Sequence, residues 1–254
     1  MKIASWNVNS LRVRLPQVLN WLSLHTPDVL ALQELKQIDA AFPLAQFTEL
    51  GYHAVFSGQK TYNGVAVLSR TACSAVETTF PEFSDEQKRL LATTINDIRV
   101  VNIYVPNGQS VGSDKYHYKL TWLAHLHDYL QQALTQYPKV VVVGDFNIAP
   151  YDEDVYDPRA WQNSVLCSPA EREALTKIFS LGFADCFRLF PQPLQTYSWW
   201  DYRTFAFQGN RGLRIDLMLG SAEFVRSVNK CWIDIAPRAW PQPSDHAPVI
   251  LTCS

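Results

Sequence analysis

The sequence feature that most constrains the fold is an unbroken run of valines in the stretch Lys139–Pro150, KVVVVGDFNIAP. Four consecutive β-branched residues, Val140–Val143, predict a strand that is buried on both faces. Gly144 is expected to break this strand, and Asp145 and Asn147 follow directly. Two residues apart beyond a central strand, the carboxylate and the amide should point the same way and suit a hard cation such as Mg²⁺. A simple turn is the alternative, because glycine, aspartate and asparagine are common turn residues.

Strand and helix patterns alternate in both halves of the chain. Apolar residues at helical spacing predict helices at Leu11–His25 and Lys115–Gln136. Ser168 and Glu171 form a capping-box pattern that starts a third helix, running to about Leu181. A short helix is predicted at Phe42–Leu50, and strands are predicted at Lys2–Trp6, Asp28–Gln33, Tyr52–Ser57, Gly64–Ser69, Leu91–Ile95, Arg99–Val105, Tyr197–Trp200, Leu213–Leu219, Val228–Ile233 and Val249–Thr252. The pattern favours one α/β domain over residues 1–254, with two packed sheets flanked by helices.

Composition narrows the class of protein. The 254 residues are 47% hydrophobic, which is typical of a globular chain with a sizeable core. No secretory h-region follows Met1 and no apolar run reaches membrane length, so a cytoplasmic protein without a membrane partner is expected. The five cysteines are widely spaced and form no CxxC pair, which indicates neither a zinc site nor a disulfide framework. A net charge of −2 argues against a protein that coats nucleic acid, but not against an enzyme with basic residues at its rim.

A polar side chain recurs at the ends of the predicted strands. Each occurrence has an ordinary structural explanation, such as a helix cap for Asn7 or a solvated loop carboxylate for Glu34. Asp216 is harder to explain, because a charged residue inside an apolar strand is costly unless it is paired. The repetition favours one shared site, whose candidate residues are Asn7, Glu34, Tyr104, Asp145, Asn147, Asp216, Asp245 and His246.

This set of side chains is chemically complete for metal-assisted hydrolysis of a phosphodiester. Glu34, with Asn7 and one or two aspartates, can hold Mg²⁺, which polarises a phosphoryl oxygen and stabilises the leaving oxyanion. A histidine beside an aspartate can orient a phosphate or transfer a proton. The chain contains no GxxxxGK[ST] and no GxSxG, so nucleotide-driven transfer and serine hydrolysis are not indicated.

Six sequence blocks then resemble the exonuclease III family of DNA repair nucleases, also called AP endonuclease family 1, within the endonuclease/exonuclease/phosphatase superfamily. The blocks are WNVNS at Trp6–Ser10, LQELK at Leu32–Lys36, YVPNG at Tyr104–Gly108, GDFNIAP at Gly144–Pro150, WWDYR to RGLRIDLML at Trp199–Leu219, and SDHAPV at Ser244–Val249. They span nearly the whole chain. The DYR and RGLRID segments favour this branch over the sphingomyelinases and inositol phosphatases of the wider superfamily.

The resemblance implies a four-layer α/β sandwich, in which two mainly antiparallel β-sheets pack face to face and are flanked by helices. It also implies a metal site drawn from Asn7, Glu34, Asp145, Asn147, Asp245 and His246, with Glu34 as the main ligand. Asp145 would activate water, and Asn147 would orient that water or stabilise the transition state. Tyr104 would contact the scissile phosphate, and His246 would bind it while oriented by Asp216. Asn107 matches a DNA-phosphate contact, and Trp199 and Leu213 match the walls of a substrate pocket.

The implied reactions are 3′–5′ exonuclease action and removal of 3′ phosphates and other 3′ blocks, with cleavage at abasic (AP) sites as a further activity. The implied cofactor is Mg²⁺, with Mn²⁺ as a substitute. The implied partner is double-stranded DNA with abasic sites, nicks or blocked 3′ ends, bound by a monomer. The stretch Tyr151–Cys167 carries the bulky residues Tyr156, Trp161 and Leu166. These predict poor abasic cleavage with 3′-end processing retained.

Two alternatives remain at this stage. A hydrolase of a small or lipid phosphoester on the same fold would act on inositol phosphates or sphingomyelin and not on duplex DNA. A binding protein with dead chemistry would lack one or more site residues, whereas all of them are present. Basic residues that could follow a DNA backbone, about half of them expected to be ordinary surface charges, are Lys60, Arg89, Lys115, Lys119, Arg203, Arg211 and Arg214.

Overall fold

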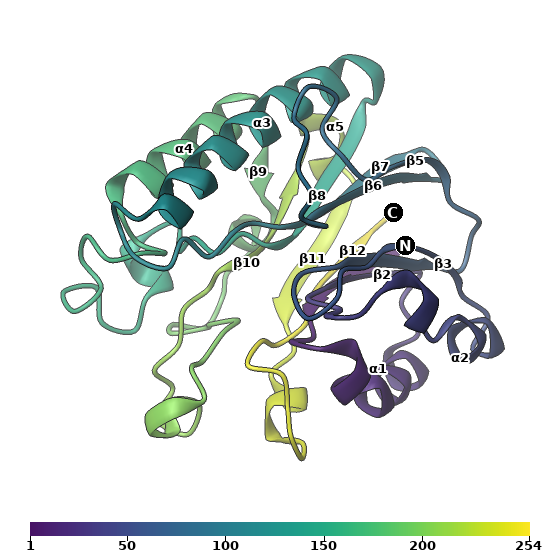
Figure 1. The fold of residues 1–254 in the computed structure, drawn as a ribbon, viewed down its shortest axis with the longest axis horizontal. Helices are drawn as coiled ribbons and strands as arrows, with labels where there is room; N and C mark the ends of the chain where they lie inside the picture. The colour runs from purple at the N-terminus through teal and green to yellow at the C-terminus, as the bar shows by residue number, and fades with distance from the viewer.

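In the computed structural model, which describes residues 1–254, two six-stranded sheets lie face to face between two layers of helices (Figure 1). The strands are β1 (Lys2–Asn7), β2 (Val29–Gln33), β3 (His53–Ser57), β4 (Val65–Ser69), β5 (Ser74–Glu77), β6 (Leu90–Ile95), β7 (Ile98–Tyr104), β8 (Lys139–Asp145), β9 (Ala184–Asp185), β10 (Asp216–Gly220), β11 (Val228–Ile233) and β12 (Val249–Cys253). The helices are α1 (Leu11–His25), α2 (Leu44–Glu49), α3 (Asp114–Gln136), α4 (Pro169–Ser180) and α5 (Ala222–Val225).

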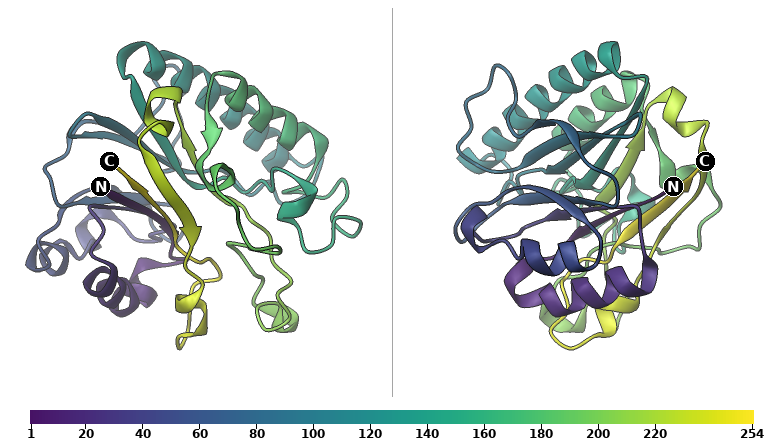
Figure 2. Two further views of the ribbon diagram at one scale, coloured as in Figure 1. Left: turned by 180° about the vertical axis from the view of Figure 1, so that it is seen from behind. Right: turned by 90° about the vertical axis from the view of Figure 1, so that its right-hand side faces the viewer.

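The sheets confirm the predicted four-layer sandwich. The first has the order β11-β12-β1-β2-β4-β3, and the second β5-β6-β7-β8-β10-β9. Helices α1 and α2 cover the outer face of the first sheet, and α3 and α4 cover that of the second, as the side view in Figure 2 shows. All strand pairs are antiparallel except β1–β2 and β7–β8, one at the centre of each sheet. Parallel neighbours require a crossover connection, which α1 and α3 supply.

Strand register brings the polar strand ends together. Across the second sheet, Asp145 lies opposite Tyr104 on one side and opposite Asp216 on the other. In the first sheet, Asn7 lies opposite Gln33, the residue before Glu34. Each sheet therefore delivers its polar residues to one edge, from which the loops at the bottom of Figure 1 project.

The valine run occupies the middle of the core, as predicted. Val141 and Val143 pack between the two sheets, whereas Val140 and Val142 pack in the cluster that α3 and α4 cover. All four are fully buried. Burying one such side chain favours folding by about 1.5–3 kcal/mol. Because alternate valines face opposite sides, this strand stabilises the apolar layers on both of its faces.

Gly144 does not break the strand, contrary to the prediction. It lies inside β8 with φ +142°, and a Cβ there would sit 1.9 Å from the carbonyl oxygen of Ile103. The glycine is therefore needed because β7 approaches too closely for any side chain. The strand ends one residue later, at Asp145.

One strand predicted in the final third of the chain is absent. Tyr197–Trp200 is not a strand, and Trp199 makes only isolated bridges to Leu213 and His246. The strand predicted from Leu213 begins at Asp216, so this aspartate stands at a strand end and not within one. Strands β5 and β9 and helix α5 were not predicted, since each is four residues or shorter and carries no periodic signal.

For two of the basic residues, the prediction that they could follow a DNA backbone is wrong. Lys119 and Arg214 are 0% and 1% exposed and are paired with buried carboxylates. Elsewhere the local signals held: helix Leu11–His25 and strand Val228–Ile233 have the predicted limits, and Ser168 caps α4 with the predicted capping box. The five cysteines carry free thiols. None of the helices combines the length and the apolar character that crossing a membrane requires.

Candidate active site

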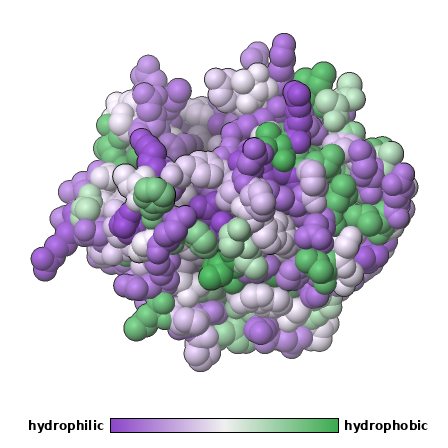
Figure 3. Space-filling view, turned by 90° about the horizontal axis from the view of Figure 1, so that it is seen from below, coloured by the Kyte–Doolittle hydropathy of each residue, from purple (hydrophilic) through white to green (hydrophobic).

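Three side chains from separate parts of the chain meet where the two sheets open at one edge. Glu34 follows β2 of the first sheet, Asp145 ends β8 of the second, and His246 precedes β12. Their ligand atoms lie within 4.8 Å of one another. Seen from below, the molecule presents mainly hydrophilic residues with small scattered hydrophobic groups (Figure 3). The convergence predicted from the sequence is therefore present for these three residues.

Asn7 joins the two carboxylates. Its side-chain nitrogen donates hydrogen bonds to Glu34 Oε1 at 2.9 Å and to Asp145 Oδ2 at 3.0 Å. Its side-chain oxygen is turned away and accepts from the backbone of Asn9 at 3.0 Å. In this arrangement Asn7 places a partial positive charge between two acids, and it would have to turn its amide to ligate a cation itself.

Asn147 reaches Asp145 through a turn, not through strand alternation. The backbone of Asn147 is left-handed, with φ +49°, and its N–H donates to Asp145 Oδ1 at 2.8 Å. Its side-chain nitrogen donates to Asp145 Oδ2 at 3.1 Å, and its oxygen accepts from Asn107 at 3.1 Å. The prediction that the two side chains lie together holds, but its stated reason was wrong: an aspartate that folds the following turn back onto itself places them there.

Unusual backbone conformations cluster around these residues. Glu34 has φ +57° although it carries a Cβ, and Asn9, Ser10 and Lys36 also have positive φ. Such conformations cost about 1–3 kcal/mol each and persist where the surrounding structure enforces them. Here the backbone N–H of Ser10 donates to the carbonyl of Glu34, and that of Lys36 donates to the carbonyl of Asn63.

The acid–base groups of the site influence one another strongly. Burial raises the pKa of Asp145 to about 7, and the carboxylates of Asp216 and Glu34 add to this effect while His246 opposes it. Burial alone would lower the pKa of His246, but Asp216 and Asp145 outweigh it and raise that pKa to about 10. The two imidazole nitrogens lie 2.9 Å from Asp216 Oδ2 and 3.7 Å from Asp145 Oδ2.

Glu34 is held ionised, and Tyr104 is held neutral. Burial would raise the pKa of Glu34, but Lys36, 2.9 Å from Glu34 Oε2, and the amide of Asn7 keep that pKa below its usual value. Burial and the neighbouring charge of Glu34 raise the pKa of Tyr104 well above that of a free phenol. Glu34 is therefore a carboxylate, and Tyr104 a neutral hydroxyl that can donate to a phosphate oxygen.

The remaining predicted residues lie around this centre. The Asp245 carboxylate accepts from Trp199 Nε1 at 3.0 Å and from Asn9 Nδ2 at 2.9 Å, and it is outside the three-residue cluster. Its role as a supporting metal ligand stays a prediction. Leu213 pairs with the backbone of Trp199 and has no exposed surface. Its role as a pocket wall also stays a prediction.

Two residues near the centre, Lys36 and Asn9, were missed as site residues, and a third, Arg89, was predicted only as a basic residue that could follow DNA. Lys36 pairs with Glu34 and donates to Asn9 Oδ1, so a cation and an amide link the first sheet to Asp245. Arg89 stacks 4.6 Å from the ring centre of Tyr104 and donates to the Tyr104 carbonyl at 3.1 Å. The available signal for Lys36 and Asn9 was their position two residues after Glu34 and Asn7. No local signal placed Arg89 beside Tyr104.

A cavity of 620 Å³ opens beside the centre. Glu34, Tyr104 and Asn107 line it together with the cations Lys36, Arg89 and Lys115. Positive side chains next to a carboxylate site suit a polyanion that approaches a bound cation.

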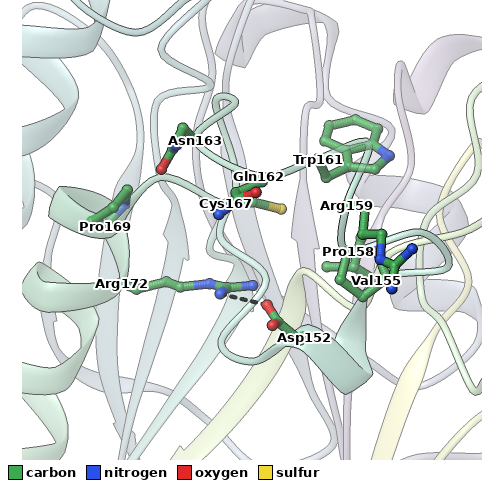
Figure 4. Close-up of a pocket in the computed structure, with 10 residues that line it drawn as sticks. All are labelled: Asp152, Val155, Pro158, Arg159, Trp161, Gln162, Asn163, Cys167, Pro169 and Arg172. Atoms are coloured by element: carbon green, nitrogen blue, oxygen red, sulfur yellow. Dashed lines mark hydrogen bonds and ion pairs between the residues drawn. The ribbon is translucent and has the colours of Figure 1, made fainter.

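The loop Tyr151–Cys167 borders the other side of the site. Tyr156 and Trp161 line a cavity of 290 Å³ together with Trp199, and the indoles of Trp161 and Trp199 meet edge to face at 6.5 Å. A second cavity of 490 Å³ lies between this loop and the start of α4, where Arg172 reaches across to Asp152 (Figure 4). The loop therefore packs against Trp199, which was predicted to be a wall of the substrate pocket.

The donor set of the centre fits a divalent cation. The Glu34 and Asp145 carboxylates converge on one point beside His246, whose pKa of about 10 keeps it protonated in the metal-free protein. Asn7 and Asn147 could each add an amide oxygen by turning the amide whose nitrogen now donates to these carboxylates. Oxygen-rich sites of this kind bind hard cations. A cation there would also offset the cost of holding Glu34 and Asp145 close together.

Without metal, the protein should lose stability as the pH rises. Asp145 and His246 bind protons more tightly in the folded chain, with pKa values of about 7 and about 10 against ordinary values of 3.8 and 6.5. The free energy of unfolding contributed by both therefore falls as pH increases across this window. We expect a lower Tm in EDTA at about pH 9 than at about pH 6. An equal or higher Tm at the alkaline pH would contradict the electrostatic description, and the variant Asp145→Asn should show a weaker dependence.

Comparison with known proteins extends the resemblance over the whole chain. The profile described as the Endonuclease/Exonuclease/phosphatase family matches residues 4–246. Exodeoxyribonuclease III of Haemophilus influenzae is 36% identical over 262 aligned positions, which cover 98% of this chain and 98% of that protein.

Solved structures of similar proteins share the fold closely. A 3′ phosphatase from Neisseria, NExo, bound to a product DNA hairpin has a TM-score of 0.98 at 43% identity, covering 100% of this chain and 99% of that one. NExo described as a 3′–5′ exonuclease from Neisseria meningitidis has a TM-score of 0.98 at 44% identity, covering 100% of both chains. An AP endonuclease from Archaeoglobus fulgidus has a TM-score of 0.95 at 38% identity, covering 100% and 99%. The likeness thus includes the whole framework that positions the site.

Proposed function

Because this chain belongs to the endonuclease/exonuclease/phosphatase family, and within it to the exonuclease III family, we propose that it is a Mg²⁺-dependent 3′–5′ exodeoxyribonuclease and 3′-end-processing enzyme of duplex DNA. As a member of that family it is a hydrolase of phosphoester bonds. The proposal treats residues 1–254 as one catalytic domain that acts as a monomer, with cleavage at abasic sites as a secondary activity.

The observation that carries the proposal is the meeting of Glu34, Asp145 and His246 within 4.8 Å. Glu34, Asp145 and the amides of Asn7 and Asn147 would hold Mg²⁺, with Asp245 in support. When bound, the cation would polarise the phosphate and stabilise the leaving oxyanion. Mn²⁺ would substitute for Mg²⁺, because oxygen-rich sites accept either cation.

The chain's own residues then divide the work on the phosphate. Asp145, whose pKa of about 7 suits a general base near neutral pH, would take the proton of the attacking water. His246, kept protonated by Asp216, would bind a phosphate oxygen, and the neutral phenol of Tyr104 would donate to another. Asn147, 3.1 Å from both Asp145 and Asn107, would orient the water while Asn107 contacts a neighbouring phosphate.

The 3′-end preference is supported by two observations. NExo, at 43–44% identity, is described as a 3′ phosphatase and as a 3′–5′ exonuclease. In this chain Tyr156 and Trp161 pack beside Trp199 and leave a cavity of 290 Å³ there. Filling this region with aromatic side chains disfavours a sugar flipped out of an intact strand more than a free 3′ end, which needs no flipping.

The proposal is tested with three labelled duplexes, each assayed with Mg²⁺ and with EDTA. One carries an internal abasic-site analogue, one a recessed 3′ hydroxyl and one a 3′ phosphate at a nick. We expect Mg²⁺-dependent release of the 3′ phosphate and of terminal nucleotides, with slower incision at the abasic analogue. Incision of the abasic analogue as the fastest reaction would refute the 3′-end preference. Inertness on all three, with hydrolysis of a small phosphoester, would refute the proposed function.

The variant Trp161→Ala should shift the balance of activities. Removing the indole that meets Trp199 at 6.5 Å enlarges the space beside the substrate pocket. We expect the ratio of abasic incision to 3′-phosphate release to rise by about tenfold, the scale on which pocket shape discriminates between substrates. Gln162→Ala, the next residue on the same loop and exposed, is the matched control and should leave the ratio unchanged. An unaltered ratio in Trp161→Ala would remove the loop from the explanation of specificity.

A further inference from the structure

Lys119 lies beneath the candidate active site and has no exposed surface. This residue of α3 directs its ammonium at three acceptors, which match the three N–H bonds that a lysine carries. They are the carbonyl oxygen of Asn107 at 3.1 Å, the carbonyl oxygen of Asn147 at 2.6 Å, and the carboxylate of Glu171. Burying a charge so completely is costly, and the protein bears this cost directly below two residues of the site.

The two carbonyls belong to loops that carry site residues from different strands. Asn107 follows β7 and Asn147 follows β8, and their side-chain amides meet at 3.1 Å. Asn147 in turn donates to Asp145 Oδ2 at 3.1 Å. Lys119 therefore fixes from below the backbones whose side chains meet above. Space around it is limited, because a Cβ on Gly108 would come within 3.2 Å of Lys119 Cδ.

Glu171 extends this contact to the loop Tyr151–Cys167. Its carboxylate, also fully buried, accepts from the backbone of Leu166 at 3.1 Å and from Ser168 at 3.0 Å through the backbone and 2.6 Å through the hydroxyl. Leu166 closes the loop by accepting from the Ala149 N–H at 2.8 Å. Next to Glu171, Arg172 holds the other end of the loop through the Ala149 carbonyl at 3.0 Å and through Asp152, as Figure 4 shows for the pair with Asp152.

We propose that Lys119 is a positioning residue for the reaction, which with Glu171 holds the Asn107 loop, the Asn147 turn and the base of the Tyr151–Cys167 loop in one fixed arrangement. The proposal rests on the proposed function for the reaction that it affects. The competing explanation is an ion pair that only stabilises the contact between α3 and α4. The two explanations differ in what happens when both charges are removed together.

The deciding variant is the double substitution Lys119→Met with Glu171→Gln. Methionine keeps an unbranched side chain of similar length without any donor, and glutamine keeps an oxygen for the capping contact with Ser168. The single variant Lys119→Met leaves Glu171 buried without its cation, and should be strongly destabilised or unfolded. The double variant contains no unpaired buried charge and should recover most of the Tm of the wild type.

If Lys119 positions the site, the recovered stability is not accompanied by recovered activity. We expect kcat for release of a 3′ phosphate at a nick to stay about 10- to 100-fold below the wild-type value, because small misplacements of reacting groups cost rates of this size. KM should change much less, since the exposed cations around the site are untouched. Leu130→Ala, a core substitution about three turns further along α3, is the control for destabilisation and should lower Tm while leaving kcat near the wild-type value. A double variant with wild-type kcat overturns the proposal.

Amide hydrogen exchange tests the same idea without activity. In the double variant, amides in residues 105–110 and 146–150 should exchange at least about tenfold faster than in the wild type, while those of β8 stay protected. Unchanged exchange in both loops overturns the positioning role. If the wild type releases no 3′ phosphate, the proposed function fails, and hydrogen exchange alone still decides the role of Lys119.

Discussion

Asp145→Asn is expected to lower the rate of 3′-phosphate release by at least about 10³-fold, because one substitution removes both a cation ligand and the proposed general base. Asparagine has the same size as aspartate and keeps one of the two oxygens that accept hydrogen bonds from Asn7 and from the backbone and side chain of Asn147, so the substitution changes the shape of the site little. Single-turnover cleavage of the nicked duplex with saturating Mg²⁺ measures the effect without interference from product release.

The same variant should not unfold the protein. Burial and neighbouring carboxylates disfavour the ionised form of Asp145, so a neutral side chain there relieves an electrostatic cost in the metal-free chain. We expect a Tm in EDTA near pH 8 that equals or exceeds the wild-type value. The surface change Asp97→Asn, at a carboxylate with 68% side-chain exposure, is the control and should keep full activity. A variant Asp145→Asn with a rate near that of the wild type would show that the site assignment is wrong.

Glu34→Gln is expected to lower cleavage at a subsaturating Mg²⁺ concentration by at least about 10³-fold, through weaker binding of the cation. Glu34 is the carboxylate that Lys36 and Asn7 keep ionised, whereas the pKa of Asp145 is raised to about 7. Glutamine removes the fixed negative charge but preserves the contact with Asn7 through its oxygen. Raising the Mg²⁺ concentration should therefore recover part of the lost rate, which it should not do for Asp145→Asn.

The difference between the two variants is measured by cleavage across a Mg²⁺ titration and by direct Mn²⁺ binding. Glu34→Gln should shift the midpoint of both curves to higher concentration. Glu49→Gln makes the same chemical change at an exposed position at the end of α2, and should leave both midpoints in place. Unshifted Mn²⁺ binding in Glu34→Gln would exclude Glu34 as the main ligand.

Local signals in the sequence determined most of the framework. The helix Leu11–His25 and the strand Val228–Ile233 have the predicted limits. Ser168 and Glu171 predicted the start of α4, because a capping box is satisfied within four consecutive residues. The valine run predicted burial on both faces because only a central strand can hide four β-branched side chains in succession. In each case the pattern that predicts the structure lies within one segment.

Site residues were predicted where polar side chains stand at strand ends, but their arrangement was not. Asn147 reaches Asp145 through a left-handed turn, and Gly144 is required by the approach of Ile103 from another strand. The short segments around Trp199 looked like a strand and are not one, because their backbone pairs only at single bridges. These features depend on segments that are distant in the sequence, so no local pattern contains them.

The sequence alone thus determined the layers, the strand ends and the types of polar residue available for chemistry. Only the tertiary structure decided that Lys119 and Arg214 are buried partners of carboxylates and not surface charges for DNA. It also decided that Glu34 and Asp145, from opposite sheets, lie close enough to share one cation. The physical reason is that burial and electrostatic coupling arise from distances between side chains, which are set by strand register and by sheet packing across the whole chain.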